Sequence, residues 1–343
     1  MSLLFLNFLI LLLFSPFAFL KSTLLKNGLF ALLILCIIFL SVFQTSSPDL
    51  DNYKLIYYGK YFRHIEPVYM DIVSFFRFIG LNFYPFWAVQ AFFLSLLFYR
   101  LVVMYADDRL LTTLLFINSY FISKQLIQTR NFFSILILLF MLRFVIERKY
   151  KAACLLYGLS SGIHYSTLLF APLFFAHSKK FEKLFFFIVM ISPIFLVYPL
   201  INLLSTISAL QISDKYVAAY YIAQLNTESD LGRSVFQIAR GFFLLVVIFL
   251  TIKKYDSKDK GLAFLVLEGL FFKFAFSSIG HLASRLSEVF LFAEVLLLPN
   301  ITKYIQNKTL YKTILVAYSF FLLISSKNTY PQFFENFTLF DYR

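Results

Sequence analysis

Two sets of three polar residues, each spaced i, i+4, i+7, lie in the second half of the sequence, largely within apolar segments. They are Arg233, Gln237 and Arg240, and His281, Arg285 and Glu288. Because residues with this spacing share one face of a helix, each set would present its polar groups in a single direction. Guanidinium groups match the oxygens of a phosphate or diphosphate, so the chemistry that this pattern predicts is the binding of a phosphorylated headgroup.

A further arginine, Arg130, begins another apolar segment. An arginine at the centre of a membrane span costs roughly 2.5 to 3.5 kcal/mol to insert, so such residues are candidates for function. Several cations that face inward at one depth repel one another unless they share an anionic partner. The alternative is that each arginine pairs with a resident carboxylate, as Arg285 would with Glu288, or extends its side chain to the membrane surface.

The longest polar stretch, residues 48–84, offers groups for acid–base catalysis. A general base needs a carboxylate or an imidazole within hydrogen-bond reach of the hydroxyl that it deprotonates. Asp51, His64 and Glu66 are the candidates here, and simple exposure to solvent is the alternative for each. His164, which lies among serines in an apolar run, is another candidate, although a buried histidine that holds a helix break together fits the same pattern.

The elements that must position these residues need lipid around them. Of the 343 residues, 60% are hydrophobic and 14% are charged, and the mean hydropathy is +0.79. A soluble domain is near half apolar and a quarter charged, so this chain is predicted to lie in a membrane. The net charge of +13 then reflects lysines and arginines in cytoplasmic loops rather than a nucleic-acid partner.

Motifs for nucleotides and metals are missing from the sequence. The patterns GxxxxGK[ST], GxGxxG and HExxH do not occur, which disfavours a nucleotide-sugar donor. Cys36 and Cys154 lie far apart in apolar segments and have neither disulfide nor zinc spacing. We therefore predict no metal and no cofactor.

Most of the chain divides into apolar segments long enough to cross the roughly 30 Å hydrocarbon core as helices. They are residues 2–20, 27–47, a segment starting at 84, 110–127, 131–147, 184–204, 234–252, 261–280, 282–301 and 310–326. The external loops are residues 48–84, which include a short interfacial helix near 68–79, and residues 205–233. We predict one all-α polytopic membrane domain over residues 1–343, with ten to twelve transmembrane helices.

Residues 152–176 do not fit a simple alternation of spans, because lysines and arginines flank them on both sides. If the segment crossed once, two strongly basic loops would be external, against the rule that positive loops stay inside. A broken or re-entrant helix, turning at Gly158, Gly162 or Pro172, removes the conflict, and a single long span is the alternative. The broken form places five cationic residues at one level near the external leaflet: Arg130, Arg233, Arg240, His281 and Arg285.

Three stretches of the sequence, in one order, resemble the EpsG-like group of bacterial polysaccharide polymerases, which are related to the O-antigen polymerases called Wzy. They are "DLDNYKLIYYGKYFRHIEPVYMDIVSFFRFIG", "QTRNFFSILILLFMLRFVIERKYKAACLLYGLSSGIHYSTLLFAPLFF" and "HLASRLSEVFLFAEVLLLP". The resemblance covers most of the chain, although each motif is short and degenerate. The positions that the resemblance singles out are Glu66, Arg130, His164 and Arg285.

The resemblance implies a GT-C-like glycosyltransferase in the inner membrane of a bacterium, with its site at the periplasmic face. Such a polymerase takes a growing glycan from polyprenyl pyrophosphate and transfers it to another lipid-linked repeat unit, which builds O-antigen or a related surface polysaccharide. The implied catalytic residues are Glu66 and His164, with Asp51 as a further candidate. The implied partners are the lipid-linked oligosaccharide, membrane lipid, a chain-length regulator and a flippase.

Two other functions are compatible with many spans and buried cations. A flippase for lipid-linked oligosaccharide would need cations along its whole path, and it would commonly show internal repeats, which this sequence lacks. A membrane acyltransferase would need a histidine-led acyl-transfer motif, and none is clear in the sequence. The cations predicted here lie at one level, which favours the polymerase.

Overall fold

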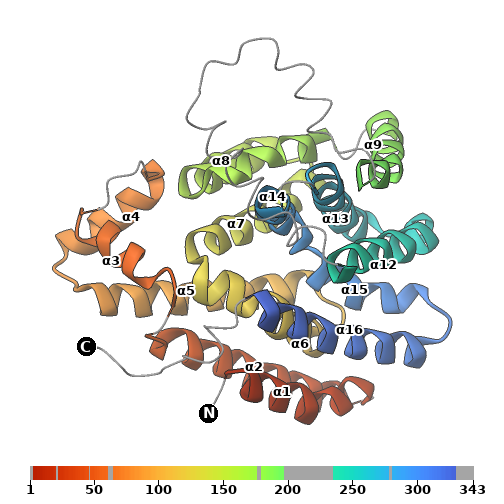
Figure 1. The fold of residues 1–343 in the computed structure, drawn as a ribbon, viewed down its shortest axis with the longest axis horizontal. Coiled ribbons are helices and arrows are strands. Elements are labelled where there is room, and N and C mark those ends of the chain that lie inside the picture. The colour runs from red at the N-terminus through yellow and green to blue at the C-terminus, as the bar shows by residue number, and fades with distance from the viewer. Residues whose placement is uncertain are drawn as a thin grey trace. The chain divides into compact units, whose positions relative to one another are not determined.

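The computed structural model of the protein describes residues 3–20, 22–45, 47–60, 65–175, 179–196, 235–277 and 280–329, and every regular element in them is a helix (Figure 1). The predicted all-α fold is therefore confirmed. By its internal contacts the chain forms two compact units: unit 1 holds residues 1–168 and 295–343, and unit 2 holds residues 169–294. The single domain that the sequence predicted stays a prediction.

Unit 1 carries most of the long helices. They are α1 (Leu3–Phe14), α2 (Thr23–Phe43), α3 (Leu50–Tyr57), α4 (Pro67–Phe78), α5 (Phe83–Tyr105), α6 (Arg109–Ser119), α7 (Thr129–Ile146), α8 (Tyr150–Ile163), α15 (Glu294–Ile301, whose first residue belongs to unit 2) and α16 (Lys308–Thr329). A π-helix, Phe121–Ile127, follows α6, and a 3₁₀ helix, Tyr165–Phe175, follows α8 and belongs to unit 2 from Leu169 on. Unit 2 contains α9 (Lys179–Ile191), α12 (Val235–Thr251), α13 (Ser257–Ala275) and α14 (Gly280–Leu291).

Four described helices are long and apolar enough to cross a membrane: α2, α5, α7 and α16. A fifth span is formed if α6 and the following π-helix count as one element. The protein is thus a multi-pass membrane protein, as predicted. The described residues contain fewer continuous spans than the ten to twelve expected, and several predicted spans are divided into shorter helices, such as residues 282–301 into α14 and α15. Part of the predicted span 184–204 and the whole predicted external loop 205–233 lie outside the described residues.

The segment 152–176 is broken, as the sequence predicted. Helix α8 ends at Ile163, and His164 has an extended backbone with φ −155° and ψ 120°. The Thr167 hydroxyl donates a hydrogen bond to the His164 carbonyl at 2.7 Å, which satisfies a backbone group that the broken helix leaves open. The break therefore lies at the histidine, and the expectation that the chain turns at Gly158, Gly162 or Pro172 was wrong.

A second break was not predicted. The sequence reads 110–127 as one straight span, but α6 and the π-helix Phe121–Ile127 are bent by 73°. Single π turns commonly mark functional positions in helices. Here the bend is followed immediately by Gln128 and the start of α7.

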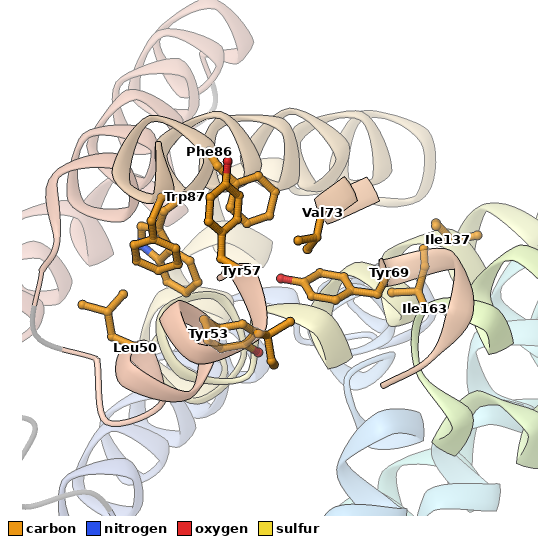
Figure 2. Close-up of a cluster of buried hydrophobic side chains, with 11 residues drawn as sticks. Leu50, Tyr53, Tyr57, Tyr69, Val73, Phe86, Trp87, Ile137 and Ile163 are labelled. Atoms are coloured by element: carbon orange, nitrogen blue, oxygen red, sulfur yellow. The ribbon is translucent and has the colours of Figure 1, made fainter. Parts of the chain in front are cut away.

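The stretch predicted as an external loop, residues 48–84, contains two helices packed on the bundle. Helix α4, Pro67–Phe78, confirms the helix predicted near 68–79. Helices α3 and α4 both end in a glycine with positive φ, Gly59 at 70° and Gly80 at 77°, the conformation that glycine tolerates best at a helix C-terminus. The two helices share an aromatic cluster with α5 that includes Tyr53, Tyr69 and Trp87 (Figure 2).

At the other end of unit 1, the ends of three helices meet at one carboxylate. Asp108, before α6, lies 3.1 Å from the Lys26 ammonium of α2 and 2.7 Å from the Lys312 ammonium of α16. Asp107 pairs with Lys303 at 3.0 Å. The partly buried Asp108 carboxylate thus ties three helices together at this end.

Candidate functional site

Glu66 stands directly before α4, in the N-cap position, and Pro67 fixes the first turn of that helix. Its carboxylate makes no cap hydrogen bond and points elsewhere. One oxygen, Oε2, accepts from Arg130 Nη1 at 2.7 Å, and the other, Oε1, lies 2.8 Å from His164 Nδ1. The backbone N–H of Tyr165 also donates to Oε1, at 3.3 Å. One carboxylate therefore joins three segments that are far apart in the sequence.

Arg130 is the second residue of α7, where the exposed N–H groups of a helix give a positive electrostatic end. Its backbone N–H donates to the Tyr53 hydroxyl at 3.2 Å. Its guanidinium carbon lies 5.8 Å from the centre of the Tyr53 ring and 5.5 Å from that of Tyr69. Figure 2 shows these two tyrosines, from α3 and α4, close to each other within the buried cluster. The aromatic rings and Glu66 together hold the guanidinium in place.

His164 reaches this position because α8 packs beside α7 after a tight turn and so runs back along it (Figure 1). The Ser160 hydroxyl donates to the Ser134 carbonyl at 3.0 Å and joins the two helices near the site. The 14 residues of α8 extend about 21 Å. The end of α8 therefore meets the start of α7, far from the basic turn that connects them.

The electrostatics of the site favour an ionised Glu66. Burial raises the pKa of the Glu66 carboxyl, but the hydrogen bond from His164 and the charge of Arg130 outweigh burial and hold the pKa below its ordinary value. The side chain of Glu66 is 8% exposed. Burial also raises the pKa values of Tyr53 and Tyr69, so both phenols stay protonated at neutral pH. The site is a buried carboxylate between a permanent cation and an imidazole.

This arrangement can perform proton transfer. When Nδ1 of a histidine donates to a carboxylate, the ring is fixed in the tautomer whose Nε2 accepts a proton, as in hydrolase triads. The His164 side chain is 27% exposed, whereas Glu66 is almost covered. The geometry therefore suits His164 as the base and Glu66 as the group that orients it.

Asp51, another candidate from the polar stretch, does not join this cluster. The Asp51 side chain is 93% exposed and faces Lys54 at 3.8 Å on the same helix. Such an exposed pair contributes little energy, and a solvated carboxylate keeps no fixed geometry. His64 lies outside the described residues.

Unit 2 holds a second group of charges, of which Lys273 and Glu294 are buried and Arg240 and Glu288 are partly buried. Both oxygens of Glu294 accept hydrogen bonds from Arg240, one from Nη2 and one from Nε at 3.3 Å. Lys273 on α13 lies close enough to Arg240 and Glu288 to interact electrostatically with both. The Ser284 hydroxyl donates to Glu288 Oε1 at 2.8 Å. Arg240 thus has a resident carboxylate partner, which is the alternative that the sequence left open for it.

The remaining predicted cations are less fully described. Arg233 lies outside the described residues, and only the backbone of His281 is described, within α14. Arg285 is exposed on α14, and Glu288 accepts a hydrogen bond from Ser284. Arg130 belongs to unit 1 and the others to unit 2, so the shared level near the external leaflet stays a prediction.

The sequence did not single out Tyr53, Tyr69 or Lys124. Lys124 is completely buried in the π-helix, and its ammonium donates to Gln128 Oε1 at 2.7 Å. Gln128 immediately precedes α7 and also accepts from Asn131 at 3.4 Å. A lysine inside an apolar run is a visible signal of a buried polar contact.

Among the described residues, no three His, Cys, Asp or Glu side chains come together as metal ligands.

Comparison with protein families supplies the decisive observation. A model described as the EpsG family matches residues 27–343, nearly the whole chain. The chain belongs to the EpsG family. A search of curated proteins and a search of solved structures each gave no match.

EpsG-like proteins are Wzy-type polysaccharide polymerases, so the resemblance seen in the sequence is confirmed. Membership of the EpsG family indicates a polysaccharide polymerase or a related glycosyl transferase, and it implies a lipid-linked oligosaccharide as substrate. The match includes the Glu66, Arg130 and His164 segments.

Proposed function

We propose that this EpsG-family protein polymerises lipid-linked oligosaccharide repeat units into O-antigen or a related surface polysaccharide. In this proposal the donor is a glycan on polyprenyl pyrophosphate, and the reaction takes place at the periplasmic face of the bacterial inner membrane. The observation that carries it is the Glu66 carboxylate, which joins Arg130 and His164 at the end of unit 1 opposite the basic loops. The fold itself supports many activities, so the argument depends on this site.

The proposed reaction is a glycosyl transfer with His164 as general base. A hydroxyl oxygen of the acceptor sugar attacks the anomeric carbon of the donor glycan, and its proton passes to His164 Nε2. The bond between that carbon and the phosphate oxygen breaks, and polyprenyl pyrophosphate leaves with the bonding electrons. Glu66 stabilises the imidazolium that forms, and Arg130 keeps Glu66 ionised and in place.

The leaving diphosphate needs a cation, and we assign this role to Arg240, with Arg233, His281 and Arg285 as further ligands. Charge builds on the diphosphate as the glycosidic bond breaks, and a preorganised guanidinium stabilises that charge more in a water-poor site than in water. Support comes from Arg240, which is partly buried, and the buried Lys273, two cations that lie near each other in unit 2. Glu294 then serves to hold Arg240 in its binding orientation.

The test of the base is a set of variants in a cell that makes the polysaccharide. His164→Ala and Glu66→Gln are expected to reduce chain extension by 10² to 10⁴-fold, the usual contribution of a general base. Cells would then carry surface glycan with a single repeat unit, at an unchanged level of the protein. Asp51→Asn is the matched control, because Asp51 is exposed, and it should keep long chains. Long chains in the His164→Ala cells would contradict the proposal.

The role of Arg240 is tested against a purely structural one. Replacing both partners of a buried ion pair by apolar residues is often neutral for stability. Arg240→Met combined with Glu294→Met should therefore accumulate normally but make only single repeat units, whereas Glu294→Gln alone should keep much of the activity. Normal long chains in the double variant would show that Arg240 only balances Glu294. A chain-length regulator and a flippase are the expected cellular partners.

A further inference from the structure

Glu66 and His164 are brought together by a contact between two nearby residues. Each of these residues lies two positions away in the sequence, one from Glu66 and the other from His164. Val68, in the first turn of α4, packs directly on Gly162, in the last turn of α8. A β-carbon added to Gly162 would lie 2.3 Å from Val68 Cγ2 and 3.1 Å from its Cβ. Because Gly162 has no side chain, Val68 can pack directly against α8 at this position.

Gly162 is required for space rather than for backbone conformation. The described glycines with positive φ are Gly59 and Gly80, and Gly162 has an ordinary helical backbone. A glycine inside a helix lowers helix stability relative to alanine, so local helix propensity alone would favour alanine here. The glycine at this position is explained by its neighbour on α4.

An alanine at this position would move the two helices apart. An ordinary contact begins near 3.4 Å, so the Val68 methyl at 2.3 Å would have to retreat by roughly 1 Å. The β-branched Val68 side chain has one strongly preferred rotamer in a helix, so the backbone of α4 would move instead. The hydrogen bonds of Glu66 to Arg130 and His164, at 2.7 and 2.8 Å, do not survive such a shift.

We propose that Gly162 and Val68 are positioning residues that hold the Glu66 carboxylate on the His164 ring for the transfer reaction. This inference depends on the proposed function, because it assigns a role to the same site. Gly162 acts through Glu66 and does not touch the substrate. It was one of the expected turning points of the chain, and its role here is instead to let α4 approach α8.

The test compares two glycines on one helix. Gly162→Ala is expected to lower the amount of long-chain polymer on the order of 10²-fold per molecule of protein, the effect of a misplacement near 1 Å. Gly158→Ala is the matched control: apart from the backbone of its own helix, no heavy atom lies within 4 Å of its added β-carbon, and long chains should remain. Equal polymer from the two variants would overturn the inference.

Rescue separates positioning from general damage. Val68→Ala removes the methyl at 2.3 Å and leaves a 3.1 Å contact, which needs a movement of only a few tenths of an ångström. The variant with both Gly162→Ala and Val68→Ala should therefore regain long chains, and regain its level in the membrane if Gly162→Ala alone has lost it. Failure of this rescue would also overturn the inference.

The same experiment distinguishes this inference from the proposed function. Glu66→Gln and His164→Ala are measured beside the glycine variants. If they keep long chains, the proposed function fails. If they lose long chains and Gly162→Ala keeps them, the site is right and only the positioning role of Gly162 is wrong.

Discussion

At the level of single residues, the site depends on side chains that depart from their usual structural roles. Glu66 occupies an N-cap position but leaves the helix end uncapped and turns to Arg130 and His164. His164 interrupts a helix where an apolar residue would continue it. Such conflicts between local preference and observed structure are common at functional sites, and both residues could be found from the sequence because they are polar residues beside apolar segments.

Glu66 also makes stability depend on pH. Its folded pKa lies below the ordinary 4.5, so the ion pair stabilises the fold fully above about pH 4.5 and this contribution is lost as the pH falls through the folded value. Thermal unfolding of the purified protein in detergent should show the midpoint of wild type falling further on acidification than that of Glu66→Gln. A parallel fall in both proteins would show that Glu66 is not ion-paired.

The tyrosines around Arg130 could not have been predicted in the same way. Tyr53 and Tyr69 are two of 22 tyrosines, and no spacing in the sequence distinguishes them from the others. Their role depends on α3 and α4 folding back onto the start of α7, which is a long-range contact. Sequence patterns report local periodicity and give no such contact.

At the level of helices, local signals predicted some elements and missed others. The interfacial helix predicted near 68–79 is α4, and Gly80 follows its end as a C-terminal glycine should. The broken segment at 152–176 followed from the positive charges at its two ends. The 73° bend after α6 was missed, because residues 110–127 carry neither a proline nor a glycine to mark it.

The ends of α2, α6 and α16 that meet at Asp108 offer a test of how these helices are joined. Asp108→Asn keeps the cap of α6 but leaves Lys26 and Lys312 facing each other without their shared carboxylate. We expect the free energy of unfolding to fall by roughly 3 kcal/mol, the lower end of the range for broken buried ion pairs, because these side chains are 11 to 18% exposed. The measurement is unfolding of the purified protein in mixed detergent micelles.

The neighbouring residue provides the control for this prediction. Asp107 pairs with Lys303, and both side chains are about one-third exposed or more. Exposed pairs contribute less than about 1 kcal/mol, so Asp107→Asn should leave unfolding almost unchanged. An equal loss in the free energy of unfolding for the two variants would show that the ion pairs of Asp108 stabilise the protein no more than the exposed pair of Asp107.

For the whole molecule, composition alone predicted a multi-pass all-α membrane protein, and the structure confirms it. Three short motifs in the sequence suggested the EpsG family, and the family match over residues 27–343 establishes it. The sequence could not show that Arg130 and Arg240 each have a carboxylate partner, Glu66 and Glu294, because these partners lie far away in the chain. The expectation that the arginines share one anion therefore gives way to a proposal with separate roles for Arg130 and Arg240.

The central claim is that this protein lengthens a lipid-linked glycan with His164 as the base. The most direct measurement uses purified protein in lipid vesicles, supplied with one lipid-linked repeat unit, and follows glycan length and free polyprenyl pyrophosphate. Wild type should produce glycans of two or more repeat units and release one polyprenyl pyrophosphate for each bond formed, whereas His164→Ala should produce neither. Movement of the lipid-linked sugar across the vesicle membrane by wild type, with no lengthening and no released pyrophosphate, would contradict the account and indicate a flippase.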